Sequence, residues 1–152
     1  MGVVVRPRRV GDADALLVAL RPVHERDGYP LHAVHLTTGW LYDGLDDAWV
    51  AELDGRLVGH VAVTPGRHLS RFFVAVDARG SGAGSALLAH VEAWADEQAL
   101  DLTLDVVEHN TDAQALYEHR GWQPTGRVPA TWVSDTGPWP DALTYRRPPG
   151  GR

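Results

Sequence analysis

Apolar residues follow two spacings along the chain, and their order predicts a mixed α/β (α+β) domain. Short apolar runs predict strands over residues 3–6, 49–53, 57–64, 68–76, 102–107, 122–127 and 142–147. Apolar residues at helical spacing predict helices over 13–25, 82–98 and 110–120, with a short further helix within 27–44. Antiparallel hairpins therefore come first, and a βαβ unit follows them.

Local turn signals indicate where these elements begin and end. Asp54-Gly55 stands between two apolar runs, and such a pair predicts a tight β-hairpin. Asn110 is a good N-cap for the helix that follows it, and Gly121 is typical of the residue just after a helix. Because no linker interrupts the pattern, we expect one domain over residues 1–147 and a disordered tail over 148–152.

Composition narrows the class of protein. The chain has 152 residues, which fits one domain with a core of its own. It contains no cysteine, which excludes a disulfide scaffold, a thiolate zinc site and a catalytic thiol. We expect no metal site.

Charge and hydropathy indicate the surroundings that we expect. The net charge of −6 argues against nucleic acid as a partner, because phosphate contacts need a basic face. No apolar run reaches the ~20 residues of a membrane span, so no membrane partner is expected. The N-terminal arginines follow a very short apolar run, unlike a secretory signal, and a cytoplasmic location is therefore expected. All 14 basic residues of the Lys and Arg types are arginine, and the chain has no lysine.

The segment VAVDARGSGAG, residues 74–84, carries the clearest chemical signal. An apolar run leads into glycines at alternate positions, and an amphipathic helical pattern begins directly after them. Unpaired backbone N–H groups at a helix start attract phosphate, and glycine lets the backbone approach it closely. An ordinary tight turn is the alternative without a ligand.

Two nucleotide-binding motifs compete for this segment. A Walker loop needs a lysine, and the chain has none, so that motif is excluded. A dinucleotide-binding turn matches in part: Gly80 and Gly82 fit, Ser85 stands in place of the last glycine, and Asp105 follows in the next strand. About 65 residues remain after the turn, which is too few for the rest of that fold.

Two motifs together resemble the GNAT acetyltransferase superfamily. Arg79, Gly82 and Gly84 occupy the fixed positions of its coenzyme A signature, R/Q-x-x-G-x-G/A after a strand. Residues 110–122 match its second signature, N-x-x-A-x-x-L-Y-x-x-x-G-F/W, at every fixed position. The resemblance covers about residues 3–147. It implies a GNAT-like fold, with a central mixed, mostly antiparallel sheet of about seven strands flanked by about four helices and splayed between strands 4 and 5.

The resemblance also implies a function and a set of cofactor contacts. An N-acetyltransferase of this family moves an acetyl group from acetyl-CoA directly to an amine. Tyr117 would be the general acid that protonates the leaving thiolate. The implied contacts to coenzyme A come from Phe73, Val74, Ala75, Val76, Arg79, Gly80, Ser81, Gly82, Ala83, Gly84, Ser85, Asn110 and Tyr117.

The base and the acceptor site are less defined. Several family members carry a Glu or His on the fourth strand, where this chain has Ser70 and Phe72. His68 and His60 are the candidate bases, and a water chain is equally plausible. Tyr29, His32 and Trp40 are candidates to line the site of a small-molecule or peptide amine.

Two rival functions and the oligomeric state stay open at this point. A catalytically idle acyl-CoA-binding sensor would bind the cofactor without turnover. A partial Rossmann protein would bind NAD, but it leaves the second signature unexplained. A homodimer stays open, because family members are often dimers.

Overall fold

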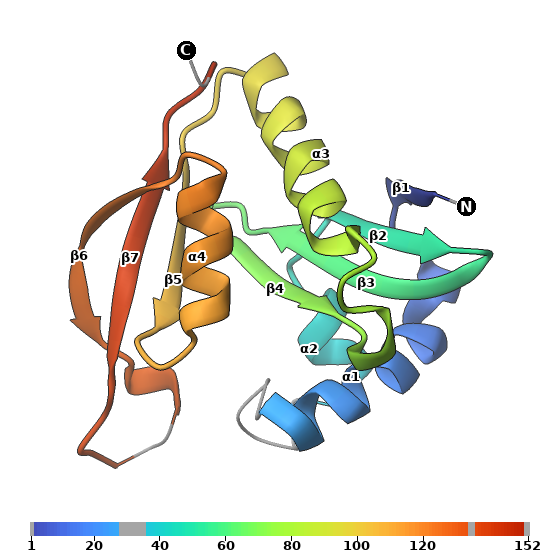
Figure 1. The fold of residues 1–152 in the computed structure, drawn as a ribbon, viewed down its shortest axis with the longest axis horizontal. Helices are drawn as coiled ribbons and strands as arrows, with labels where there is room; N and C mark the ends of the chain where they lie inside the picture. The colour runs from blue at the N-terminus through green and yellow to red at the C-terminus, as the bar shows by residue number, and fades with distance from the viewer. Residues whose placement is uncertain (1, 28–35, 134–135, 151–152) are drawn as a thin grey trace. The chain divides into compact units, whose positions relative to one another are not determined.

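The computed structural model describes residues 2–27, 36–133 and 136–150. Within these residues the chain forms seven strands and four α-helices, joined in places by short 3-10 turns (Figure 1). Two compact units are present, Met1–Ala93 and Trp94–Arg152. The strands pair in two antiparallel sheets, and the division falls between the fourth and fifth strands, where the resemblance predicted that the sheet opens. The predicted fold class is thereby confirmed.

The first unit is built on a sheet with the order β1-β2-β3-β4. Its elements are β1 (Val3–Pro7), α1 (Ala13–Asp27), α2 (Thr38–Tyr42), β2 (Asp47–Leu53), β3 (Arg56–Val63), β4 (Leu69–Val74) and the start of α3 (Ala83–Glu97), with 3-10 turns η1 (Val10–Asp12) and η3 (Val76–Ala78). Asp54 and Gly55 both have positive φ, 54° and 80°, as the two-residue turn of a tight hairpin requires. The predicted hairpin is confirmed.

Helices cover both faces of this sheet (Figure 1), with α3 on one face and α1 and α2 on the other. Alternate residues of β3 serve the two sides. A Cβ on Gly59 would lie 2.9 Å from Leu87 Cδ1 of α3 and 3.2 Å from Phe73 O, so a side chain here would force its neighbours to shift. The next residue, His60, lies on the opposite face of the sheet. The fully buried apolar core of the unit includes Leu16, Leu20, Leu41, Val50, Val58, Val61, Leu87, Leu88 and Val91.

Strand β4 contains a β-bulge that the apolar pattern did not reveal. His60 pairs with Phe73 and Ala62 pairs with Ser70, so Arg71 and Phe72 together oppose one residue of β3. Arg71 takes a left-handed conformation with φ 54°, which is uncommon for a residue with a side chain. The strand bends at this position, close to the residues that lead into the glycine turn.

The second unit contains β5 (Leu102–Val107), α4 (Thr111–His119), β6 (Gln123–Pro129), the 3-10 turn η4 (Thr131–Val133) and β7 (Asp141–Arg147). Its strand order is β5-β7-β6, so the last strand is the central one. The core includes Leu102, Leu104, Trp122 and Tyr145. After β7 the backbone N–H of Gly150 donates to Asp96 at 2.7 Å, within the segment for which we expected disorder.

The first helix is two residues longer than its predicted range of 13–25. Helix α1 continues through Pro22 and ends at Asp27. Asp12 does not cap α1, because its carboxylate accepts from the backbone N–H of Arg9 at 2.7 Å and from both terminal nitrogens of Arg6. None of the helices in the described part of the chain is long and apolar enough to span a membrane.

Candidate functional site

The glycine turn follows β4 and η3 and leads into α3. Gly80 and Gly82 have φ of 81° and 89°, the left-handed region in which a side chain is strained. A Cβ built on either residue would meet no atom within 4 Å. These glycines are therefore needed for the backbone conformation, and the space beside them is open to a ligand.

Backbone donors converge on this turn. The first i→i−4 bond at the start of α3 runs from Ala86 N–H to Gly82 O, at 2.9 Å. The N–H groups of Gly84 and Ser85 precede that bond, so the helix supplies them with no carbonyl. The positive end of the helix dipole lies at the same place. The turn thus has the open space, the donors and the field that an anionic group such as a pyrophosphate needs.

The turn is also stabilised by bonds of its own. Ser81 N–H donates to Ala78 O at 3.2 Å, and Ser81 Oγ accepts from Ala83 N–H at 3.3 Å. The guanidinium of Arg79 reaches back to Val74 O, with both Nε and Nη2 at 3.4 Å. These bonds fix the shape of the loop before any ligand arrives.

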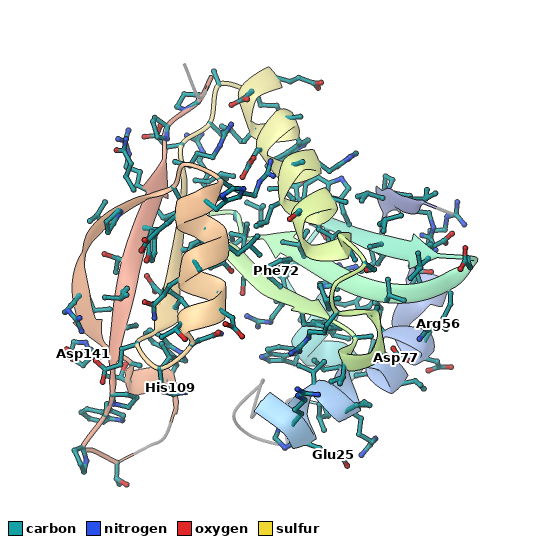
Figure 2. The ribbon with its side chains drawn as sticks, viewed as in Figure 1. Glu25, Arg56, Phe72, Asp77, His109 and Asp141 are labelled. Atoms are coloured by element: carbon teal, nitrogen blue, oxygen red, sulfur yellow. The ribbon has the colours of Figure 1, made fainter. Side chains whose placement is uncertain are left out.

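Side chains at the two ends of this region are visible in Figure 2, which labels Phe72 on β4 and the pair Arg56 and Asp77. Arg56 Nη1 lies 3.1 Å from Asp77 Oδ1, and both side chains are largely exposed. Such a pair contributes little stability. Its effect is local, because it joins the first residue of β3 to the segment just before the glycine turn.

The end of β4 supplies the backbone that the cofactor prediction named. Phe73 pairs with β3, and Ala75 N–H donates to Val58 O at 2.7 Å, which extends the pairing beyond the strand. Strand β4 is the terminal strand of its four-stranded sheet, so β3 occupies only one of its two edges. The other edge of Phe73–Val76 has no strand partner in that sheet and fits an extended polar ligand.

The second signature forms helix α4, as predicted. Asn110 is the N-cap and accepts from Ala113 N–H at 3.3 Å. Tyr117 follows two turns later and is 6% exposed. Its ring centroid lies 5.9 Å from that of Trp122 and 6.1 Å from that of Tyr145. These aromatic neighbours hold the phenol ring in one orientation.

The two candidate bases occupy different environments. His60 is 0% exposed, with Nε2 lying 3.1 Å from Arg8 Nη1 and Nδ1 lying 2.8 Å from Arg71 O. Burial lowers the pKa of His60 to about 4, and the nearby charges of Arg8 and Arg71 add to this effect. His68 is partly exposed in the turn between β3 and β4, where its backbone N–H donates to Thr64 Oγ1 at 3.2 Å.

Of the three substrate candidates, only Trp40 lies within the described residues. It belongs to α2, and the guanidinium carbon of Arg71 lies 4.4 Å from its ring centroid. Tyr29 and His32 lie outside the described residues. Sequence reasoning missed Arg8 and Arg71, because nothing in the spacing of two of fourteen arginines indicates that both would meet His60.

Comparison with known proteins agrees with the two motifs. The sequence profile described as "Acetyltransferase (GNAT) family" matches residues 14–122. The chain is 34% identical over 103 residues to the peptidyl-lysine N-acetyltransferase YiaC of Escherichia coli, covering 63% of this chain and 65% of the relative. It is 37% identical over 94 residues to YjaB of Salmonella typhimurium, another peptidyl-lysine N-acetyltransferase, covering 60% of this chain and 59% of the relative. The chain therefore spans less than two thirds of either relative.

Solved structures show the same fold at lower identity. The ribosomal-protein-alanine N-acetyltransferase of Brucella melitensis matches with a TM-score of 0.72 and 24% identity, over 95% of this chain and 99% of that one. The NAA60 protein of Arabidopsis thaliana, in complex with a bisubstrate analogue, matches with a TM-score of 0.73 and 19% identity, over 99% of each chain. At these identities the likeness concerns the fold alone.

Proposed function

The chain belongs to the acetyltransferase (GNAT) family, and on that premise we propose that it transfers an acetyl group from acetyl-CoA to an amine. The observation that carries the proposal is the glycine turn. Gly80 and Gly82 hold a backbone conformation that leaves open space beside the N-terminus of α3. That arrangement suits the pyrophosphate of coenzyme A.

Each part of the cofactor has a matching part of the chain in this proposal. The backbone from Arg79 to Ser85 would bind the pyrophosphate, and the outer edge of Phe73–Val76 would pair with the amides of the pantetheine arm. Asn110 would add a contact from the start of α4. The charge of Arg79 and the dipole of α3 would both favour the anionic groups.

The reaction needs two proton transfers. The neutral amine nitrogen attacks the thioester carbonyl carbon, a C–N bond forms and the C–S bond breaks. The departing sulfur takes a proton from the hydroxyl of Tyr117, which regains one from solvent. The amine gives up its proton to a base, so the products are an amide and free coenzyme A.

The proton acceptor is proposed to be His68 or a chain of water. An imidazole can take a substrate proton only through an accessible nitrogen lone pair. His60 has no exposed surface, and both of its ring nitrogens are hydrogen-bonded. His68 is partly exposed, and histidine is the side chain that most often acts as a general base.

The proposed acceptor is the side-chain amine of lysine in a peptide or protein. Both curated relatives are named peptidyl-lysine N-acetyltransferases. The net charge of −6 favours association with a cationic partner. Helix α2 and the segment before it, with Trp40, Tyr29 and His32, are proposed to line the acceptor side.

Release of a free thiol tests the activity. The chain is mixed with acetyl-CoA and an N-terminally blocked peptide that carries one lysine, with the matching arginine peptide as control. We expect thiol release and a mass gain of one acetyl group on the lysine peptide only. Binding of coenzyme A without thiol release would contradict the proposal and support the idle acyl-CoA-binding module.

A further inference from the structure

A partly buried chain of hydrogen bonds, centred on the buried His60, links three strands of the first sheet. Arg8, just after β1, approaches His60 of β3, with Nη1 and Nε2 separated by 3.1 Å. The other ring nitrogen of His60, Nδ1, lies 2.8 Å from the carbonyl oxygen of Arg71 in the bulge of β4. His60 thus stands between a guanidinium donor on one side and a backbone acceptor on the other.

Arg8 and Arg71, the two arginines of this hydrogen-bonded chain, also bind helix α2. Arg8 donates to Leu41 O at 2.7 Å and to Leu45 O, and its guanidinium carbon lies 3.7 Å from the ring centroid of Tyr42. Arg71 Nε donates to Trp40 O at 3.0 Å. The carbonyls at the end of a helix have no partner within it, and cations suit that end of the dipole. The two guanidinium groups therefore fasten the end of α2 to the sheet.

Only a neutral imidazole completes this arrangement. Arg8 can only donate and the carbonyl of Arg71 can only accept, so the ring must accept at Nε2 and donate at Nδ1. A protonated ring would place N–H against the N–H of Arg8. A phenyl ring of similar shape would leave both partners without their bond to residue 60.

The same hydrogen-bonded chain also restrains the bulge of β4. Arg71 holds φ 54°, a conformation that persists in a residue with a side chain only where its surroundings enforce it. Its carbonyl is bonded to His60, and its side chain donates to Trp40 O and to Ser70 Oγ at 2.8 Å. Backbone and side chain of one residue thereby connect β4 to both His60 and α2.

We propose that His60 is a positioning residue that joins Arg8 to the bulge of β4 and so holds α2, with Trp40, in one place beside that strand. This inference rests on the proposed function, in which β4 binds acetyl-CoA and α2 lines the acceptor side. Fixing α2 against β4 would set the distance between the two substrates. His60 acts through its partners and touches neither substrate.

The test compares His60→Phe, His60→Gln and Val61→Ala by hydrogen–deuterium exchange of the peptide covering residues 36–46. The phenyl ring removes both hydrogen bonds, and the glutamine amide can restore the bond to Arg8. Val61 is equally buried on the same strand but lies on the face toward α3, so it controls for general loss of stability. We expect faster exchange in His60→Phe, partial rescue in His60→Gln and wild-type exchange in this peptide for Val61→Ala.

The kinetic arm uses acetyl-CoA and the blocked lysine peptide. His60→Phe is expected to raise the KM for the peptide about tenfold while the KM for acetyl-CoA stays within about twofold, because misplacing a substrate wall affects the acceptor first. Wild-type exchange of residues 36–46 in His60→Phe would overturn the proposal, as would equal acceleration in Val61→Ala. If His60→Phe does not fold, the exchange of residues 36–46 in His60→Gln is compared with that in Val61→Ala and tests the proposal instead.

Failure of the proposed function gives a different pattern. In that case the wild-type chain would show no stabilisation by coenzyme A and no peptide acetylation. The exchange comparison would still test whether His60 holds α2 through Arg8 and Arg71. A positive exchange result with an unchanged KM for the peptide would overturn the positioning role and leave a purely structural one.

Discussion

The hydroxyl of Tyr145 donates to Glu118 Oε2 across 2.6 Å and thereby joins the central strand of the second sheet to helix α4. Burial and the adjacent carboxylate raise the pKa of Tyr145 to about 12, so the hydroxyl stays a donor throughout the physiological range. The neighbouring residue on α4 is Tyr117, whose ring packs against that of Tyr145. One tyrosine thus supports the placement of the other.

Removing that hydroxyl should destabilise the chain. We predict that Tyr145→Phe lowers the free energy of unfolding by about 1 kcal/mol, the usual net value of one hydrogen bond. Urea unfolding of the variant beside Glu118→Gln, which keeps an acceptor at the same position, measures the effect. An unchanged midpoint in Tyr145→Phe would show that the bond adds nothing.

The depressed pKa of His60 predicts a loss of stability in acid. Its folded pKa of about 4 lies below the ordinary 6.5, so the unfolded chain binds the proton more readily. No penalty exists above pH ~6.5. As the pH falls toward 4 the penalty grows to ~3 kcal/mol, at about 1.4 kcal/mol for each pKa unit.

A comparison with His60→Gln isolates this effect, because the glutamine does not titrate while all carboxylates remain. We expect the wild-type stability to fall more steeply than that of the variant between pH 6.5 and 4. Denaturant unfolding at several pH values gives the two curves. Parallel curves would mean that His60 is not buried as a neutral ring.

Two glycines have similar backbone strain, so substituting each of them separates an effect on coenzyme A binding from an effect on stability. Gly82 and Gly55 have φ of 89° and 80°, and a Cβ on either would meet no atom within 4 Å. Alanine at either position should cost roughly 1–2 kcal/mol of stability. We predict that Gly82→Ala also loses affinity for coenzyme A, whereas Gly55→Ala keeps it. Equal affinities by calorimetry would refute the pyrophosphate assignment.

The general-acid role of Tyr117 predicts a defect in rate and not in binding. Tyr117→Phe keeps the ring against Trp122 and Tyr145 but cannot protonate the leaving sulfur. We expect kcat to fall about 100-fold, which is within the usual range for general acid catalysis. The dissociation constant of coenzyme A should stay near the wild-type value. A wild-type kcat would exclude the role.

Local signals allowed most elements to be predicted. Asp54-Gly55 predicted its hairpin, and Asn110 and Gly121 predicted the two ends of α4, because each signal acts within a few residues. The bulge at Arg71 and the link between Arg8 and His60 could not be predicted in this way. Those two side chains stand 52 positions apart, and no local pattern encodes their contact.

The same reasoning explains why the glycine turn could be predicted from the sequence and the surroundings of His60 could not. The glycine turn needs particular residue types at fixed spacing, so the sequence alone identifies it. The apolar run over 57–64 predicted the strand that carries His60 and therefore a place for His60 on one face of the sheet. It could not tell whether that face was open to substrate or covered, and the answer depends on α2, which is distant in sequence.

Because the protein has no lysine, acetylation of its own side chains should not interfere with the peptide assay. Its 14 basic side chains are all arginine, which acetyl-CoA does not acetylate under assay conditions. After long incubation with acetyl-CoA alone, we predict a mass gain of at most one acetyl group, at the N-terminal amine. Intact-mass spectrometry measures this, and further additions would indicate acylation of another side chain.

The central claim is that the chain binds coenzyme A, with the pyrophosphate at the glycine turn and the pantetheine arm along the outer edge of β4. Thermal unfolding with acetyl-CoA, coenzyme A or NAD tests it most directly, because NAD shares the pyrophosphate but lacks the pantetheine arm. A ligand at about 100 times its dissociation constant adds ~2.7 kcal/mol of stability. We predict a rise in Tm with acetyl-CoA and coenzyme A and none with NAD. A rise with NAD alone, or with none of the three, would contradict the account.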